Sequence, residues 1–375
     1  MVRLADESLG FLREGAFESW RSDLGLSYRE AATVLVAAAP GSIVGGVFSA
    51  LADYRSRRLI ASGGAFGFAA SLLAFALGHS FVVLVAASFG LGVAATAMVH
   101  ACEVALIDLA GERLEQAIGS ASLFGAAGDL LGPLALVVTA ALGWSWRTPF
   151  VVGAALCAAY GVWLATLPLP RPVHGDHQAG ALRTTLSLLR DPAIWRFALV
   201  GVLFVQLDEA YLAFVIAYLR RGQHLSAAAA TLTASAIVVG TIVGFMTAAR
   251  RPRRGSTRRA LQQTSAVLAA SSIGIALLPG PIPISACGLV FGFASARFWV
   301  VFHAIVLRHR PGRAGSVTAV VGNLEMLGFG LPVAIGAIAD AHGLRAGLVC
   351  YAAVPIALLF VVASAARPAT DRASA

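Results

Sequence analysis

Long apolar runs separated by short polar gaps fill almost the whole chain. A helix that spans a bilayer needs about 20 mostly apolar residues, which is longer than most strands. Runs of that length lie at 30–51, 59–78, 81–101, 118–142, 149–167, 197–219, 227–249, 260–279, 284–307, 316–339 and 346–366. A further run at the amino end is interrupted by charges. The pattern predicts an all-α membrane protein with about 12 transmembrane helices.

The arginines predict how these helices are oriented. All 28 basic residues are Arg. With the amino end in the cytoplasm, most of them fall in cytoplasmic segments, and RRPRRGSTRR (250–259) is the densest. The segments that are then predicted to lie outside the cytoplasm hold Arg21, Arg29, Arg147, Arg220, Arg221 and Arg345. Because cytoplasmic loops carry the excess of positive charge, we expect a multi-pass protein of the plasma membrane with both termini in the cytoplasm.

The composition excludes an ordinary soluble fold. Hydrophobic residues make up 58% of the chain and charged residues 13%, whereas soluble domains carry about a quarter charged residues. The net charge of +9 lies in gaps between apolar runs rather than on one soluble face. We therefore assign the charge to membrane topology and expect no nucleic-acid partner.

A polar stretch at 168–195, the longest in the chain, divides the predicted helices into two groups. We predict a six-helix half at 1–167, a cytoplasmic central loop, and a second six-helix half at 196–375. The halves carry similar motifs in the same order: LADE (4–7) corresponds to QLDE (206–209). Parallel repeats of this kind are a known transporter plan, with the substrate site between them near the middle of the membrane.

The same comparison suggests that the first helix is truncated. In the second half, 14 residues separate Ile194, near the start of the seventh predicted helix, from Asp208, but only five residues precede Asp6. The repeat predicts that about eight to ten residues are missing from the first helix. We therefore expect the native protein to begin before Met1.

Charge gathers between the second and third predicted helices, in SALADYRSRRLIASGG (49–64). Asp53 is followed four and five residues later by Arg57 and Arg58. In this loop the chain resembles the Major Facilitator Superfamily, although Ser49 and Ser56 stand where that family usually has Gly. The resemblance implies the fold of that superfamily and a gating role for this loop, with Asp53 holding one of two alternating states together.

The fifth predicted helix extends the resemblance. Its residues Gly119, Gly128, Gly132 and Pro133 are similar to the antiporter pattern of the superfamily. The similarity implies efflux and a smooth glycine face along which neighbouring helices slide. An Arg that many drug antiporters carry in the fourth helix is replaced by Ala86.

Ionisable side chains inside membrane helices are costly and usually functional. We expect Asp208 and Glu209 to couple transport to protons, because two adjacent carboxylates in a low-dielectric site resist being ionised together. The remaining candidates are Asp6, Glu7, Glu14, Asp129, Glu325 and Arg297. Structural ion pairing, for example between Arg297 and Glu325, is the alternative.

These features favour a secondary transporter that moves a small molecule by alternating access, with proton-coupled efflux as the expected mode. The intramembrane acids suggest a cationic or amphiphilic substrate, and we expect a monomer in the lipid bilayer. Proton-linked uptake and a transport-inactive membrane sensor remain alternatives. The chain carries no phosphate-binding loop, metal-ligand spacing or nucleophile arrangement, so we expect neither an enzyme nor a cofactor.

Overall fold

The structure is a computed structural model that describes residues 2–51, 56–110, 114–169, 187–250, 257–309 and 314–365, and all regular elements in these ranges are helical. The contacts divide the chain into two compact units. The first contains Met1–Gly175, Leu212–Leu232 and Pro332–Leu344, and the second contains Asp176–Tyr211, Thr233–Leu331 and Arg345–Ala375.

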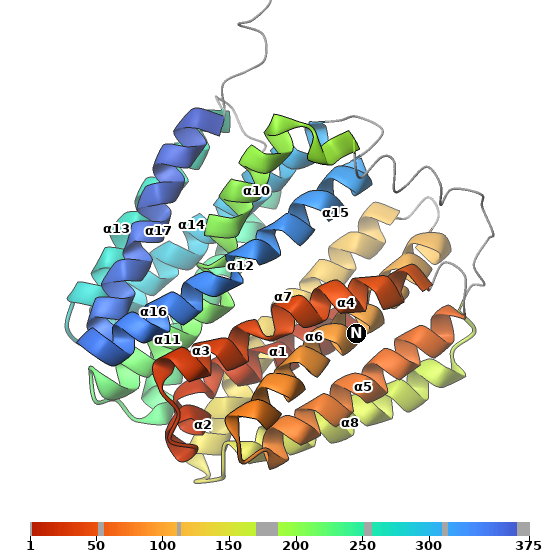
Figure 1. Ribbon diagram of the computed structural model, residues 1–375, viewed down its shortest axis with the longest axis horizontal. Helices are drawn as coiled ribbons and strands as arrows, with labels where there is room; N and C mark the ends of the chain where they lie inside the picture. The colour runs from red at the N-terminus through yellow and green to blue at the C-terminus, as the bar shows by residue number, and fades with distance from the viewer. Residues whose placement is uncertain are drawn as a thin grey trace, which may run out of the picture. The chain divides into compact units, whose positions relative to one another are not determined.

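Each unit contains helices that pass one another in antiparallel order (Figure 1). The first unit is built from α1 (Val2–Gly15), α2 (Phe17–Asp23), α3 (Tyr28–Val36), α4 (Ala38–Leu51), α5 (Arg57–Leu77), α6 (Phe81–Ala110), α7 (Leu114–Ala141), α8 (Arg147–Thr166), most of α11 (Glu209–Arg221) and most of α16 (Gly330–His342). The second is built mainly from α10 (Pro192–Val205), α12 (Ala227–Arg250), α13 (Thr257–Leu277), α14 (Pro281–Arg308), α15 (Ala314–Glu325), η2 (Met326–Phe329) and α17 (Leu344–Ala365).

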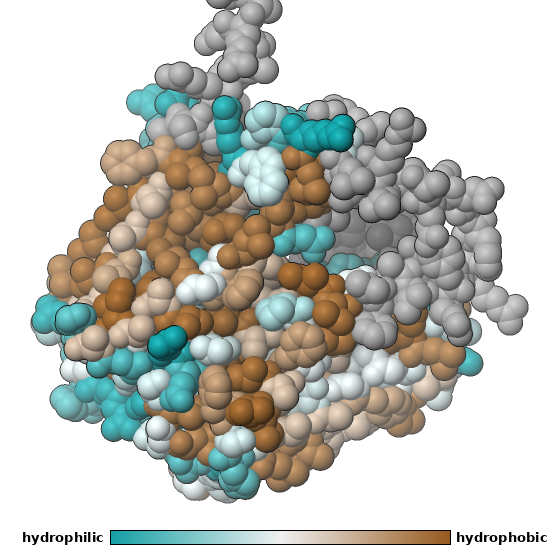
Figure 2. All heavy atoms as spheres, viewed as in Figure 1, coloured by the Kyte–Doolittle hydropathy of each residue, from teal (hydrophilic) through white to brown (hydrophobic). Residues whose placement is uncertain are grey.

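Large apolar side chains cover much of the exposed surface of these helices (Figure 2). Ile282 is 82% exposed, Val82 70% and Phe360 69%. Within the described residues, nine segments are long and apolar enough to cross a membrane. A surface of this kind is stable against lipid tails, whereas in water it would be an unusually extensive apolar patch.

Three of the predicted spans are interrupted, although the sequence pattern predicts continuous helices. The span at 30–51 divides into α3 and α4 just before Pro40, which has no N–H to donate to the carbonyl group of Val36. The span at 316–339 passes through the short 3₁₀ helix η2, and Pro332 likewise cannot donate to the carbonyl of Gly328. Periodicity alone does not reveal such breaks.

The third interruption changes the setting of Asp208. Residues 206–208 form a turn between α10 and α11. There the backbone N–H of Leu207 bonds to the carbonyl of Phe204 at 2.9 Å, a three-residue spacing. Asp208 therefore lies at a break, whereas the sequence predicts it in the middle of a regular helix. Its repeat counterpart Asp6 lies inside continuous α1.

Glycines bring helices into close contact at equivalent places in both units. A Cβ atom at Gly45 of α4 would lie 2.6 Å from the carbonyl oxygen of Val93 in α6. In the second unit a Cβ atom at Gly244 of α12 would lie 2.8 Å from the carbonyl oxygen of Phe293 in α14. Such close backbone approach is how small residues hold membrane helices together.

Candidate functional site

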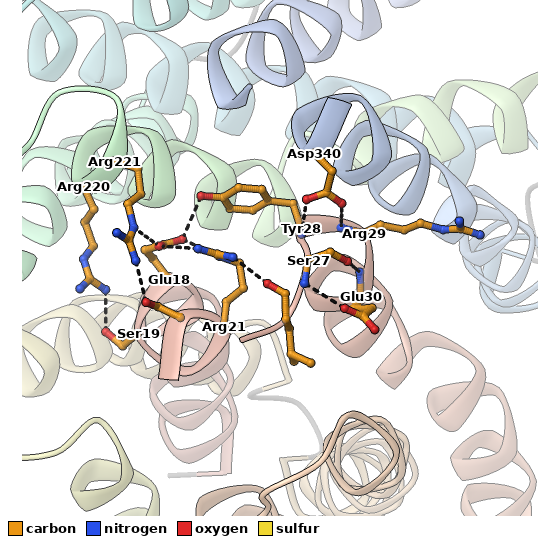
Figure 3. A network of polar contacts seen from close by, with 12 residues as sticks. Glu18, Ser19, Arg21, Ser27, Tyr28, Arg29, Glu30, Arg220, Arg221 and Asp340 are labelled. Carbon is orange, nitrogen blue, oxygen red and sulfur yellow. Dashed lines mark hydrogen bonds and ion pairs between the residues drawn. The ribbon is translucent and has the colours of Figure 1, made fainter. Parts of the chain in front are cut away.

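The Glu18 carboxylate of α2 is the centre of a polar network in the first unit (Figure 3). It is fully buried. Arg21, one helical turn later, donates from Nε to Oε2 and from Nη2 to Oε1, both at 2.9 Å. Arg221 of α11 donates from Nε to Oε1 at 2.5 Å. Two guanidinium groups thus compensate one buried negative charge.

The last turn of α11 makes further bonds to α2. The Arg220 guanidinium donates to the Ser19 hydroxyl at 2.7 Å, and Nη2 of Arg221 donates to the Ser22 hydroxyl at 2.6 Å. Tyr28, at the start of α3, donates its hydroxyl to Glu18 at 3.3 Å. We call these seven residues, Glu18, Ser19, Arg21, Ser22, Tyr28, Arg220 and Arg221, the Glu18 network.

The amino end of α3 is capped by a carboxylate from α16. Asp340 accepts the backbone N–H of Tyr28 at 2.7 Å and that of Arg29 at 2.9 Å (Figure 3). Ser27 and Glu30 add a capping box within the helix itself. The first N–H groups of a helix have no partner inside it and attract negative charge, so Asp340 bonds to groups that would otherwise need water.

Gly336 allows α16 to approach α3 this closely. A Cβ atom at Gly336 would lie 2.6 Å from the carbonyl oxygen of Tyr28 and 2.9 Å from the backbone nitrogen of Arg29. Real Cβ atoms essentially never show contacts this close. The Asp340 cap therefore depends on a glycine one helical turn earlier.

Aromatic side chains lie beside these polar contacts. Phe17 and Phe214 are fully buried, with ring centroids 5.5 Å apart, and Tyr28 lies 6.4 Å from Phe214. These ring contacts join α2 and α3 to α11. Apolar packing therefore accompanies the polar bonds between these early and late helices.

A second ion pair, at the last residue of α2, joins only early parts of the chain. Arg147 at the start of α8 donates to Asp23 at 2.5 Å, and the Trp146 indole donates to the same oxygen at 3.1 Å. These bonds hold the pKa of the Asp23 carboxyl below its ordinary value. This pair offers a natural comparison for the Glu18 network.

The sequence-predicted acids of the first unit lie mostly on α1. Glu7 is 3.8 Å from Arg3, whose guanidinium also binds Glu103. Glu14 is buried and lies 3.1 Å from Arg13. Asp6 and Asp129 are partly buried, on α1 and α7 respectively.

In the second unit, Asp208 is exposed at the break described above, and Glu209 is the first residue of α11. Glu325 is buried at the end of α15. Arg297 lies over the Phe293 ring at 5.7 Å from its centroid. Within the described residues, no ion pair joins Arg297 to Glu325. The pairing that the sequence suggested as an alternative is therefore not formed.

The loop and glycine motifs are described in part. Asp53 lies outside the described residues, whereas Arg57 is buried and Arg58 is exposed. A Cβ atom at Gly128 would lie 2.8 Å from the carbonyl oxygen of Leu4, and one at Gly132 would lie 2.8 Å from that of Ser8. Gly119 and Pro133 also belong to α7. The glycine face of α7 therefore lies directly against α1.

Sequence reasoning missed the residues that join the early and late helices. Arg220 and Arg221 entered it only as topology signals, and Asp340 did not enter it at all. One signal was available: two adjacent arginines lie on the side that the orientation rule predicts to be poor in positive charge. Charge placed against that rule needs a partner, and here Arg221 pairs with Glu18 while Arg220 bonds to Ser19.

Among the described residues, long apolar helices that pack through glycines define a multi-pass helical membrane protein. The family model of the Major Facilitator Superfamily matches residues 15–331. The chain belongs to the Major Facilitator Superfamily and is therefore a secondary transporter of small molecules rather than a member of an enzyme family. No curated protein matches it.

Solved structures of transporters share this fold. The nucleoside transporter NupG superposes with a TM-score of 0.77 at 13% identity, covering 98% of this chain and 99% of that one. A bacterial homologue of the human lysosomal transporter Spinster, inward-facing and occupied, gives 0.76 at 15% identity, covering 99% and 96%. A POT family transporter in complex with 5-aminolevulinic acid gives 0.76 at 11% identity, covering 97% and 94%.

Proposed function

We propose that this protein exports a small molecule in exchange for protons by alternating access, with the predicted halves 1–167 and 196–375 moving about the central loop. The observation that carries the proposal is the set of bonds from the Glu18 network and the Asp340 cap. These bonds join helices of both halves and are polar, so they can be broken and re-formed during a cycle.

The orientation rule supports an outer position for these contacts. They lie on the side whose segments hold six of the 28 arginines, whereas RRPRRGSTRR (250–259) alone holds six on the opposite side. On this assignment Glu18–Arg221 and the Asp340 cap close the outer side. Opening toward the outside then requires Arg221 and Asp340 to leave their partners, which costs a few kcal/mol before new contacts compensate.

The antiporter-like glycine face of α7 supports export. Proton-linked uptake is the second candidate, and the similarity to the nucleoside transporter NupG is the observation that favours it. Coupling through an intramembrane carboxylate is common to both candidates. The cationic or amphiphilic substrate that the acids suggest also belongs to this proposal, as do the monomeric state and the plasma membrane location.

Transport measurements in vesicles test the direction. Everted membrane vesicles would be energised with an acid interior, and a panel of cationic dyes, nucleosides and 5-aminolevulinic acid would be offered outside. Accumulation driven by the pH gradient supports proton-coupled export. Accumulation only in right-side-out vesicles with an acid exterior supports uptake, and equilibration that ignores the gradient contradicts proton coupling.

Cysteine labelling tests the outer closure. Ala213 of α11 is fully buried in the first unit, so Ala213→Cys, in a background without the four native cysteines, reports access from outside. We expect Arg221→Ala to increase labelling by an impermeant maleimide. Arg147→Ala, which breaks only the pair with Asp23, is the matched control and should leave labelling unchanged. Equal labelling in all three proteins would contradict the closure.

A further inference from the structure

Glu325 is a buried carboxylate at a weak point of its helix. It is the last residue of α15, and the chain continues as the 3₁₀ helix η2 before α16 begins. Its exposed fraction is 7%. A 3₁₀ segment within a long helix often marks a hinge. The position therefore combines an ionisable group with a place where the backbone can bend.

The carboxyl group of Glu325 rests on a glycine of α10, the helix that lies beside α15 (Figure 1). A Cβ atom at Gly201 would overlap the Glu325 carboxyl group. One turn further on, a Cβ atom at Gly328 would lie 3.0 Å from the carbonyl oxygen of Val202. We call this arrangement of Glu325 against Gly201 and Gly328 against Val202 the glycine seat.

Glu325 has no hydrogen bond or ion pair with any residue that the structure describes. The described charged or titratable side chains on the neighbouring helices are Arg196 of α10 and Cys287, Arg297 and His303 of α14. None of them bonds to it. A buried carboxylate without a counter-charge is costly to ionise, so the neutral, protonated form is the one that fits the seat.

The first unit contains a similar arrangement with the charge compensated. Glu7 of α1 lies over the glycine face of α7, its Cγ atom 3.7 Å from where a Cβ atom of Gly125 would be. However, Glu7 is 38% exposed and paired with Arg3. The two residues therefore differ in the charge they can carry: Glu7 can remain ionised in place beside Arg3, whereas Glu325 cannot remain ionised in its seat.

We propose that Glu325 in its glycine seat is the proton-binding site of the transporter, and that loss of its proton releases α15 from α10. This inference rests on the proposed function only for its role in transport. The step is a simple acid dissociation, in which the carboxyl O–H bond breaks and the proton passes to water. The resulting carboxylate must leave the seat to be solvated, and the hinge at η2 allows that movement.

Infrared spectroscopy of the purified wild-type protein tests the proton site without any substrate. We expect a protonated-carboxyl carbonyl band at neutral pH that disappears on alkaline titration. The band should be absent in Glu325→Gln and retained in Glu7→Gln, the matched control. Replacing sodium by N-methylglucamine should not alter the titration. A band that survives in Glu325→Gln, or one that depends on sodium, overturns the proposal.

Hydrogen exchange tests the coupled movement. At alkaline pH, amides of 192–206 and 314–329 should exchange severalfold faster in the wild type than in Glu325→Gln, with no such difference at acid pH. Gly201→Ala fills the glycine seat and should lower the pH at which the protonated-carboxyl infrared band disappears. This variant gives a second test if Glu325→Gln folds poorly. Equal exchange at every pH contradicts the release of α15.

The two proposals fail in different ways. If the band titrates as expected but no member of the vesicle panel accumulates with a pH gradient, the proton site remains and proton-coupled export is wrong. If pH-driven accumulation occurs but Glu325→Gln retains it fully, export remains and Glu325 is not the coupling site.

Discussion

Asp340 and Tyr28 belong to helices 312 residues apart in the chain, yet the Asp340 carboxylate accepts the Tyr28 backbone N–H at 2.7 Å. The bond caps the amino end of α3 from α16. The bond exists only while α3 and α16 are in contact. Because α3 also carries its own capping box, the Asp340 cap stabilises the contact with α16 and is not required for α3 to form.

The first prediction concerns this cap. Asp340→Ala should destabilise the closed arrangement by about 0.5–2 kcal/mol, the usual cost of losing a helix cap. Asp340→Asn should keep only one of the two bonds, because its amide nitrogen cannot accept a backbone N–H. Labelling of Ala213→Cys should rise most in Asp340→Ala and less in Asp340→Asn. Unchanged labelling in Asp340→Ala would show that the cap does not contribute.

The second prediction concerns unequal partners in the Glu18 network. Glu18→Gln should destabilise the protein by about 3 kcal/mol, because it leaves Arg21 and Arg221 without their shared anion. Arg221→Gln should cost only roughly 1–2 kcal/mol, because Arg21 still holds both oxygens of Glu18. Thermal unfolding in detergent measures which of the two variants loses more stability. A larger loss in Arg221→Gln would contradict the central role of Glu18.

The third prediction concerns Gly336. Gly336→Ala should separate α16 from α3 and weaken the Asp340 cap, because the added Cβ would meet the backbone of Tyr28 and Arg29. Gly330→Ala is the matched control at the start of the same helix, where a Cβ meets nothing within 4 Å. Only Gly336→Ala should increase labelling of Ala213→Cys. Similar labelling in the two variants would mean that close approach is not needed.

The fourth prediction concerns pH and the Asp23–Arg147 pair. The folded pKa of Asp23 is lowered, so its contribution to stability is present above the ordinary value of 3.8 and is lost as pH falls through the lower folded value. Asp23→Asn should therefore lose less stability on acidification than the wild type does below about pH 4. Unfolding followed by tryptophan fluorescence at a series of pH values measures the difference. Parallel curves for the two proteins would contradict it.

The fifth prediction comes from the loop motif. Asp53→Asn should nearly abolish transport while expression stays normal, because the carboxylate would hold one of the two states together. Flux in proteoliposomes measures the effect for whichever panel compound the wild type carries. Normal flux in Asp53→Asn would leave only a topological role for this loop.

The sequence by itself determined the class of this protein. Apolar runs of membrane-spanning length, with polar gaps between them, have no stable alternative to helices in lipid. The loop around Arg57 and Arg58 and the glycines of α7 were sufficient to indicate the superfamily. These features are local or periodic, so they can be read from neighbouring residues.

Only the tertiary structure decided which charges meet. Glu18 and Arg221 are far apart in the chain, and the local sequence around either residue does not predict that the two form an ion pair. Glu325 shows the same limit. The sequence offers Arg297 as its partner, but the carboxyl group packs against Gly201 and has no partner among the described residues. Partner choice depends on helix breaks and close glycine contacts, and these are set by the three-dimensional arrangement rather than by hydrophobic periodicity.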